Sequence, residues 1–325
     1  MVAAVRVHKH GGPEVLTYEQ VEVAAPGPGQ IRIKQRACGI NFIDTYFRMG
    51  MYPSPVGMPF VSGNEAAGEV TAVGPGVTDL KVGDRIAYVH AMGAYAEEKL
   101  LPADRAVKIP DGVTTKVAAA SFLQGLTAQY LATSTYPLQQ GDSCLVHAAA
   151  GGVGLLLCQI AKMRGAFVIG TASTPEKLDL ARGAGADETI NYTTRDFAAE
   201  ARRITNDVGV VVVYDSVGRT TFEGSLNSLR RRGLLALFGQ SSGPVPAFDP
   251  QILNRKGSLF LTRPTLNDYV ATREELVQRS NELFGWIRDG VLKVKIGAEF
   301  PLVRAADAHR ALASRKTTGK VVLVP

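Results

Sequence analysis

A glycine-rich run near the middle of the chain has the residue types of a phosphate-binding loop. The letters AAAGGVG begin at Ala148 and stand between a buried-strand pattern and a helical one. Gly151 and Gly152 would let backbone N–H groups approach a pyrophosphate at a helix N-terminus, and Gly154 would let the helix pack closely on its strand. Ala149 replaces the first glycine of the usual GxGxxG spelling, and such a run can also serve tight packing alone. With strand, loop and helix in the required order, the run predicts an NAD(P)H-dependent oxidoreductase.

The residues after the next strand indicate which dinucleotide is bound. An acidic side chain roughly 20 residues after the glycines would hold the ribose 2′-OH of NAD, and residues 170–174 (GTAST) contain none. Ser173 and Lys177 follow instead, with Arg182 further along, and hydroxyl and ammonium groups suit a 2′-phosphate. A different interpretation is that Ser173 and Glu176 form a capping box at a helix start, with Lys177 solvated. The pattern favours NADPH over NADH.

A second motif has the spelling of a hydrolase nucleophile. Residues 239–243 read GQSSG, which matches GxSxG and follows a strand. Pro244 and Pro246 come next, so the helix that presents such a serine cannot begin there. A turn at the carboxyl end of a sheet strand, where a cofactor lies, explains the glycines better.

Composition and charge narrow the class of protein. The chain has 325 residues, of which 46% are hydrophobic, enough for two globular domains. Its three cysteines, Cys38, Cys144 and Cys158, are too scattered for a disulfide framework, and neither a signal peptide nor a membrane-spanning stretch is indicated. The net charge of +6 includes one tight basic run, residues 230–232, and is attributed to a phosphate-bearing cofactor and a solvated surface. We expect a cytoplasmic protein.

The elements that must position these residues fall into two groups. Short alternating segments with glycine- and proline-rich turns make the first part β-rich, and a helical spacing at 114–133 then leads into the second domain. Beyond residue 142, apolar strands alternate with helices, which predicts a parallel sheet covered on both faces. The expected strands are 5–7, 30–34, 68–73, 85–88, 144–147, 167–170, 210–214, 234–238, 258–262 and 321–324, and the expected helices are 155–164, 175–182, 221–229 and 274–289.

Longer motifs point to a family. They are KHGGPEVL at 9–16, GINFIDTY at 39–46, GNEAAG at 63–68, AAAGGVG at 148–154, YDSVG at 214–218 and TRP at 262–264. Over its whole length the chain resembles the zinc-independent quinone oxidoreductases of the medium-chain dehydrogenase/reductase superfamily, the zeta-crystallin-like group, and especially the bacterial quinone reductases. The resemblance implies an α/β fold: a GroES-like β-barrel catalytic domain, residues 1–125 and 265–325, and a Rossmann domain with a doubly wound parallel sheet, residues 126–264. It also implies a homodimer in which the strand near Leu259 pairs with its mate.

The resemblance bears on metal binding as well. In zinc alcohol dehydrogenases of the superfamily a Cys and a His ligate the catalytic metal, and the matching positions here are Asn41 and Asn64. Neutral amides are poor zinc ligands. The four-cysteine structural zinc lobe is also missing, since no cysteine lies between Tyr88 and Pro110, and His90 has no second ligand near it in the sequence. We expect no zinc.

The family pattern also implies site residues. Asn41, Asp44, Tyr46, Tyr52 and Arg263 are expected around the substrate, where tyrosine hydroxyls could bond a developing hydroquinone oxygen and Arg263 could stabilise its negative charge. Each also has a structural interpretation, as a packing aromatic, a helix-start acid or a surface charge. Tyr192 and Arg315 would join Lys177 at the 2′-phosphate. The residues implied at the cofactor are Asn41, Thr127, Gly151, Gly152, Val153, Ser173, Lys177, Tyr192, Ser216, Phe238, Gly239, Gln240, Ser241 and Arg315.

The activity implied is NADPH-dependent reduction of a quinone. A hydride would pass directly from the nicotinamide to a quinone in the cleft between the domains, with proximity and orientation doing most of the work. Reduction of activated C=C bonds, in enones or enoyl thioesters, would use the same geometry and stays an alternative. RNA binding is an alternative of another class, because zeta-crystallin-like proteins can bind RNA and the chain is basic. A catalytically idle NADPH-binding protein is the third.

Overall fold

The computed structural model describes residues 1–325, and its backbone contacts divide the chain into two units. Met1–Leu126 and Val270–Pro325 form one, which we call the split unit, and Thr127–Tyr269 form the other, which we call the inserted unit. The divisions fall after Leu126 and Tyr269, where boundaries after residues 125 and 264 were expected, so helix α8 (Leu266–Tyr269) goes with the inserted unit. Helix α2 (Thr115–Tyr130) contains the first division.

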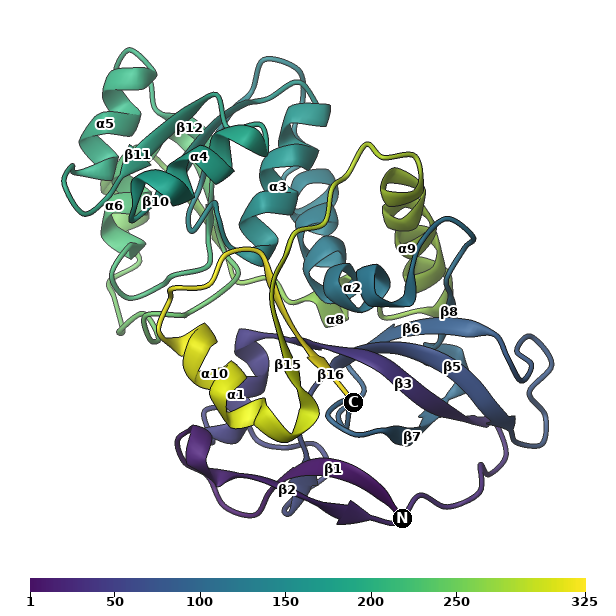
Figure 1. Cartoon of the computed structure of the whole chain (residues 1–325). Helices are drawn as coiled ribbons and strands as arrows, with labels where there is room; N and C mark the ends of the chain where they lie inside the picture. Colours follow the sequence, from purple (N-terminus) through teal and green to yellow (C-terminus); the bar gives the residue numbers. More distant parts are fainter. The chain divides into compact units, whose positions relative to one another are not determined.

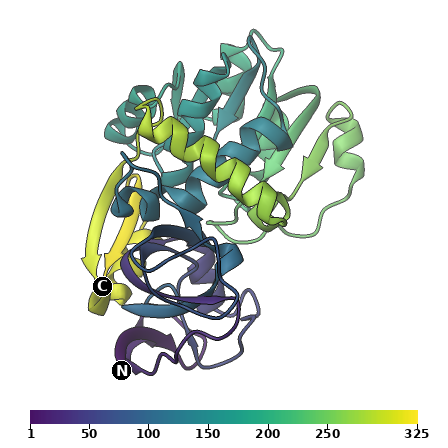
Figure 2. The same ribbon diagram turned by 90° about the vertical axis from the view of Figure 1, so that its right-hand side faces the viewer.

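The split unit contains two sheets (Figure 1). The larger has seven strands, six of them in the order β15-β16-β3-β5-β6-β8 with β7 paired to β3, and the smaller has the order β2-β1-β4. Figures 1 and 2 show both chain ends in this unit, where the last strand, β16, pairs with β3. The strands are β1 (Val2–Val7), β2 (Leu16–Val21), β3 (Gln30–Ile40), β4 (Phe60–Val61), β5 (Glu65–Val73), β6 (Arg85–Val89), β7 (Glu98–Pro102), β8 (Val107–Lys108), β15 (Ile296–Pro301) and β16 (Lys320–Val324).

The core of the split unit comes from the inward faces of these strands. Along β3 the side chains alternate, so Ile31 and Ile33 are fully buried while Lys34 is exposed. The two isoleucines belong to one buried cluster with Leu101 and Leu323 from other strands. Besides α2, the helical segments of this unit are η1 (Pro13–Val15), α1 (Phe42–Arg48), η2 (Ala103–Arg105), α9 (Arg273–Arg288), η4 (Leu302–Arg304) and α10 (Ala305–Ala313).

Six parallel strands form the sheet of the inserted unit, in the order β11-β10-β9-β12-β13-β14. Figure 1 labels three of them, β10, β11 and β12. The chain begins in the middle at β9, adds β10 and β11 on one side, and returns to add the others on the opposite side. This reversal is the doubly wound Rossmann topology, with its switch point between β9 and β12. The elements are η3 (Leu131–Thr135), β9 (Ser143–Val146), α3 (Gly152–Met163), β10 (Phe167–Ala172), α4 (Pro175–Gly183), β11 (Glu188–Asn191), α5 (Phe197–Ile204), β12 (Val210–Asp215), α6 (Phe222–Ser228), β13 (Leu229–Leu237), α7 (Gln251–Arg255), β14 (Phe260–Thr262) and α8.

Most of the predicted elements are confirmed, several with shifted starts, of which two have a plain cause. Helix α3 begins at Gly152 and not at Leu155, because the glycines themselves form its first turn. Strand β13 begins at Leu229, well before the expected 234, because a bulge extends it. Among the elements that the patterns missed are α1, β11, α5, β15 and α10, which have between 4 and 9 residues and are too short to establish a clear period.

Candidate active site and cofactor site

The carboxyl edge of the parallel sheet gathers most of the residues predicted for the cofactor. Because all the strands run the same way, the segments that follow them leave the sheet at one edge. Thr127, by contrast, is buried in α2, and Arg315 is exposed after α10 in the split unit. The predicted residues at the edge are Gly151, Gly152 and Val153 after β9, Ser173 and Lys177 after β10, Tyr192 after β11, Ser216 after β12, Phe238, Gly239, Gln240 and Ser241 after β13, and Arg263 after β14.

The glycine loop has the geometry of a phosphate-binding helix entry. Ala148 has a left-handed backbone, with φ of 50°, and Gly151 caps α3 without a side chain that could accept from the first N–H groups. A Cβ added at Gly154 would lie 2.3 Å from the Ala148 carbonyl oxygen, so the close packing of helix on loop requires glycine. The start of this 12-residue helix therefore presents open N–H groups and the positive end of a helix dipole. Pyrophosphate is the kind of group that such an end binds.

The turn between β10 and α4 carries the hydroxyl and ammonium groups predicted to recognise a 2′-phosphate. The N-cap of α4 is Thr174, whose Oγ1 accepts from the Lys177 N–H at 3.4 Å. The interpretation that Ser173 caps this helix in a box with Glu176 is therefore wrong, because the helix starts one residue later. Partial burial lowers the pKa of the Lys177 ammonium. Arg182 pairs with Asp179 on its own helix, 2.6 Å away, so its charge is already partnered.

A buried polar network lies beneath this edge. Asp215 Oδ1 accepts from the N–H groups of Val217 and Gly218 at 2.7 and 3.0 Å. Its Oδ2 accepts from Ser225 Oγ at 2.8 Å, and that hydroxyl is 3.0 Å from His147 Nε2. Burial lowers the pKa of His147, so its ring is neutral. No local motif predicted this network, and its one signal in the sequence is an acid at the end of the apolar strand β12.

The GxSxG run forms a loop and not a nucleophile elbow, as the prolines predicted. The Ser241 N–H donates to the Ser216 carbonyl at 3.2 Å, and Ser242 Oγ donates to the Val217 carbonyl at 2.7 Å. A Cβ added at Gly239 would lie 2.5 Å from the Ser216 carbonyl oxygen, so this glycine lets the loops after β12 and β13 touch. The next helix, α7, begins well beyond the run.

The asparagines at the positions that match zinc ligands belong to a buried cluster in the split unit. Lys320 Nζ donates to Asn41 Oδ1 at 2.8 Å and to Glu65 Oε2 at 2.5 Å, and Asn41 Nδ2 donates to the same Glu65 oxygen at 2.8 Å. Asn64 Nδ2 donates to Asp44 Oδ1 at 2.8 Å, and the Asn41 N–H donates to Asp44 Oδ2 at 2.9 Å. None of these five residues, which we call the buried polar cluster, is more than 4% exposed.

The cluster continues through a chain of hydrogen bonds. Tyr95 donates its hydroxyl to Asp44 Oδ2 at 2.9 Å and lies 3.1 Å from His309 Nε2, and His309 Nδ1 lies 2.9 Å from Arg48 Nη1. Burial lowers the pKa of His309 to about 3, so the neutral ring can accept from Arg48 and donate to Tyr95. Burial also raises the pKa of Asp44 to about 6, although the bonds from Asn64, Asn41 and Tyr95 lower it.

The remaining predicted substrate residues are less enclosed. Tyr46 is buried in α1 and meets Tyr52 edge-on, with ring centroids 5.4 Å apart. Tyr52 is half-buried and also meets Phe47 edge-on. Arg263 is exposed, and its Nη1 lies 3.5 Å from the Pro264 carbonyl oxygen. Asn41, Asp44, Tyr46 and Tyr52 thus share one segment of the split unit, and Arg263 belongs to the inserted unit.

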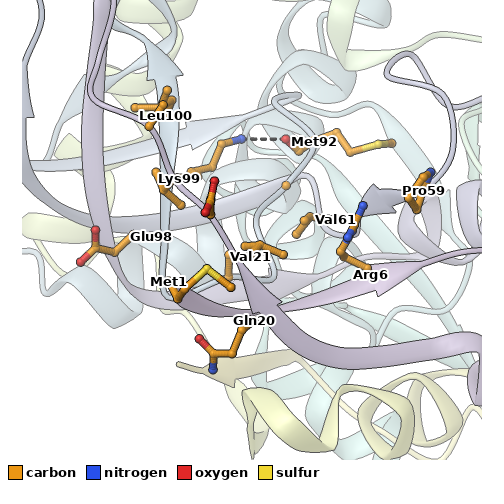
Figure 3. A pocket seen from close by; sticks show the side chains of 15 residues that line it. Met1, Arg6, Gln20, Val21, Pro59, Val61, Met92, Glu98, Lys99 and Leu100 are labelled. Atoms are coloured by element: carbon orange, nitrogen blue, oxygen red, sulfur yellow. Dashed lines mark hydrogen bonds between the residues drawn. The ribbon is translucent and has the colours of Figure 1, made fainter.

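A groove of about 770 Å³ in the split unit involves none of the predicted site residues. Figure 3 shows Val21, Val61 and Leu100 around it, with Lys99 bonded to the Met92 carbonyl at 2.7 Å. Burial lowers the pKa of Lys99 to about 7. We do not assign the cofactor or the substrate to this groove.

Two further features of the whole chain are plain. No three His, Cys, Asp or Glu side chains are grouped as a metal ion would require. None of the helices combines the length and the apolar character needed to cross a membrane.

Comparison with known proteins decides the family. Residues 27–111 match the alcohol dehydrogenase GroES-like domain, and residues 152–278 match the zinc-binding dehydrogenase model. A quinone oxidoreductase of Pseudomonas aeruginosa is 49% identical over all of both chains. The chain belongs to the quinone oxidoreductase family. The Escherichia coli quinone oxidoreductase crystallised with NADPH superposes with a TM-score of 0.97 at 48% identity, over 99% of this chain and 100% of that one. The family also includes a Burkholderia 2-haloacrylate reductase, 45% identical over 100% of this chain and 99% of its own.

Proposed function

We propose that this protein is an NADPH-dependent quinone reductase. The observation that carries the proposal is the carboxyl edge of the sheet, where an uncapped helix start, a serine and a lysine stand where a dinucleotide bearing a 2′-phosphate would lie. Residues 170–174, at the end of β10, contain no carboxylate that would repel that phosphate or hold a ribose hydroxyl. The name of the Escherichia coli relative and its complex with NADPH support the same cofactor and substrate.

The groups of the split unit support a reaction without zinc. A metal at the matching positions would meet the amides of Asn41 and Asn64, which are poor zinc ligands. It would also meet the Lys320 ammonium, 2.8 Å from Asn41 Oδ1, and like charges repel strongly away from water. We infer that this ammonium, paired with Glu65, supplies the positive charge that a metal ion supplies in zinc-dependent relatives.

The chain's own residues then have three tasks. When bound, NADPH supplies a hydride. Gly151, Gly152 and the start of α3 hold the pyrophosphate, while Ser173 and Lys177 hold the 2′-phosphate. Tyr46 and Tyr52 are proposed to orient the quinone through their hydroxyls, and Arg263 to stabilise the negative charge on its oxygen. Asn41 and Asp44 already have partners at both polar atoms, so we assign them to positioning.

A second candidate substrate class is an activated C=C bond. The 2-haloacrylate reductase among the relatives favours it, and hydride addition to an activated alkene needs the same cofactor position. RNA binding and an idle NADPH-binding role are less well supported, because neither uses the tyrosines near α1.

We further propose a homodimer that works in the cytoplasm. Strand β14 ends the sheet, so one of its edges is unpaired, and Phe260 on it is 61% exposed. Such an edge can pair with a second copy. Three buried free cysteines suit a reducing compartment. Light scattering of the wild type and of Phe260→Asp tests the dimer, and an unchanged mass in the variant would reject this edge as the contact.

The function is tested by mixing the protein with NADPH and 1,4-benzoquinone or 9,10-phenanthrenequinone and following the nicotinamide absorbance. Consumption that saturates with quinone supports the proposal. Consumption with enones or 2-haloacrylate alone would move the function to the second candidate, and binding of NADPH without turnover on any acceptor would leave the idle role.

A further inference from the structure

A second polar groove lies in the inserted unit and is used by none of the residues proposed for the cofactor. It encloses about 500 Å³. Its charged lining residues are Arg202, Asp207, Arg230, Arg231, Arg255 and Lys256, five cations and one carboxylate. The basic run at 230–232 that stands out in the sequence thus has a defined place in the fold.

The groove is at the opposite edge of the sheet from the glycine loop. Asp207 and its neighbour Val208 come just before β12, Arg230 and Arg231 are at the start of β13, and residues 255–257 precede β14. In a parallel sheet the segments that precede the strands meet at the amino edge. The groove is therefore separate from the carboxyl edge, where the cofactor residues lie.

The backbone holds these arginines outside the regular ladder. Val210 pairs with Leu229 and Val212 with Leu234, so the residues between Leu229 and Leu234 form a large bulge in β13. Arg232 has φ of 59°, and its N–H donates to the Gly257 carbonyl at 2.9 Å. A Cβ added at Gly257 would lie 3.1 Å from Arg231 Cγ, so the glycine packs directly against that side chain.

Little inside the protein neutralises the cations. Arg202 donates four hydrogen bonds, all to backbone carbonyls, at 2.6 to 3.0 Å, which fix the guanidinium and leave its charge uncompensated. Lys256 bonds to the neutral amide of Asn227. Only Arg255 has an acidic partner, Asp249 at 3.3 Å. The side chains of Arg230 and Arg231 are exposed and form no ion pair.

We propose that this groove binds a short linear phosphate chain, such as tripolyphosphate or the triphosphate of a nucleotide. Guanidinium groups match phosphate oxygens with paired hydrogen bonds, and an already fixed Arg202 loses little freedom on binding. A volume of about 500 Å³ fits a small molecule and is modest for a macromolecule. The groove is lined by none of the residues proposed for the cofactor or the quinone, so we propose a binding site and not a second active site.

The test is calorimetric titration of the full-length protein, saturated with NADPH, with sodium tripolyphosphate and, in a second arm, with ATP without metal. Arg230→Gln and Arg231→Gln are each expected to weaken binding roughly tenfold, and Arg231→Lys to lose less than Arg231→Gln. Arg310→Gln, an exposed arginine of the split unit paired with Asp307, is the matched control and should leave binding unchanged. Equal affinities for the two ligands would identify the phosphate chain as the part that the groove recognises. Tighter binding of ATP would identify a nucleoside triphosphate as the ligand.

Three results with the small ligands would overturn the proposal. They are no tripolyphosphate or ATP binding, binding that only appears when NADPH is left out, and equal losses in the control variant. Binding of a short single-stranded RNA in place of both small ligands would also reject it. Because NADPH saturation is measured first, failure of the cofactor assignment is seen separately from failure of the groove.

Discussion

The buried polar cluster and the carboxyl edge of the parallel sheet contain similar side chains used in opposite ways. In the cluster, Asn41, Asp44 and Lys320 are bonded to other groups of the chain and are almost fully buried. At the edge, Ser173 and Lys177 are half-buried, and a helix start lies open. The difference suggests that the cluster is set during folding and the edge is completed by a ligand. Substitutions in the cluster should therefore cost stability, and substitutions at the edge should cost binding.

The largest effect is expected for Lys320→Met. It would leave the Glu65 carboxylate buried without its cation, and breaking a buried pair from one side costs about 3–5 kcal/mol. The matched control is Lys116→Met, since Lys116 forms an exposed pair with Glu299 that should contribute about 0–1 kcal/mol. Urea unfolding measures both.

The double variant Lys320→Met with Glu65→Gln refines this result. Removing both charges should restore a clear part of the lost stability, because the uncompensated carboxylate is gone. A double variant as unstable as Lys320→Met would mean that shape, not charge, holds the cluster together.

Asp44→Asn should change the pH dependence of stability. With its folded pKa at about 6, above the ordinary 3.8, the folded protein keeps this proton longer than the unfolded chain. The contribution of Asp44 is therefore fully present below the unfolded pKa and is lost, by up to roughly 3 kcal/mol, as pH rises from about 4 to about 6. The stability of Asp44→Asn relative to the wild type should rise over that window, in unfolding curves taken at several pH values. A fall in that relative stability would mean that the hydrogen bonds from Asn64, Asn41 and Tyr95 hold the pKa of Asp44 below its ordinary value.

Lys177→Ala should weaken NADPH binding by about 1–3 kcal/mol, the range for a hydrogen bond to a charged group, and leave NADH almost unaffected. Unlike the cluster variants it should leave the unfolding midpoint unchanged. Fluorescence titration with both nucleotides measures it. The control is Lys162→Ala on α3, which removes an exposed ion pair with Asp187. Equal losses for NADPH and NADH would remove Lys177 from the phosphate site.

The smallest effect is expected for Ser173→Ala. Its hydroxyl is outside the cap of α4, so stability should not change, and NADPH affinity should fall by about 0.5–1.5 kcal/mol. Thr174→Ala removes the cap itself. It should leave NADPH affinity unchanged and cost about 1 kcal/mol of stability. If both variants behaved alike, the division between cap and ligand contact would be wrong.

The two regions also differ in how far the sequence predicted them. The glycine loop, Ser173 and Lys177 follow from local patterns, because a parallel sheet brings consecutive strand ends to one edge. The residues after the other strands were implied only by the family resemblance. The cluster joins Asn41, Glu65 and Lys320 from distant parts of the chain, and no local period brings them together. Its signals were weak: an acid starting a strand of small residues, and a lysine at the head of the apolar strand β16.

Whether the protein is an NADPH-dependent quinone reductase is decided by comparing NADPH and NADH as donors to 9,10-phenanthrenequinone, in the wild type and in Lys177→Ala. We expect the wild type to consume NADPH rapidly and saturably and NADH much more slowly, and the variant to lose that preference. No consumption of either nucleotide, or equal rates with both in the wild type, would contradict this expectation.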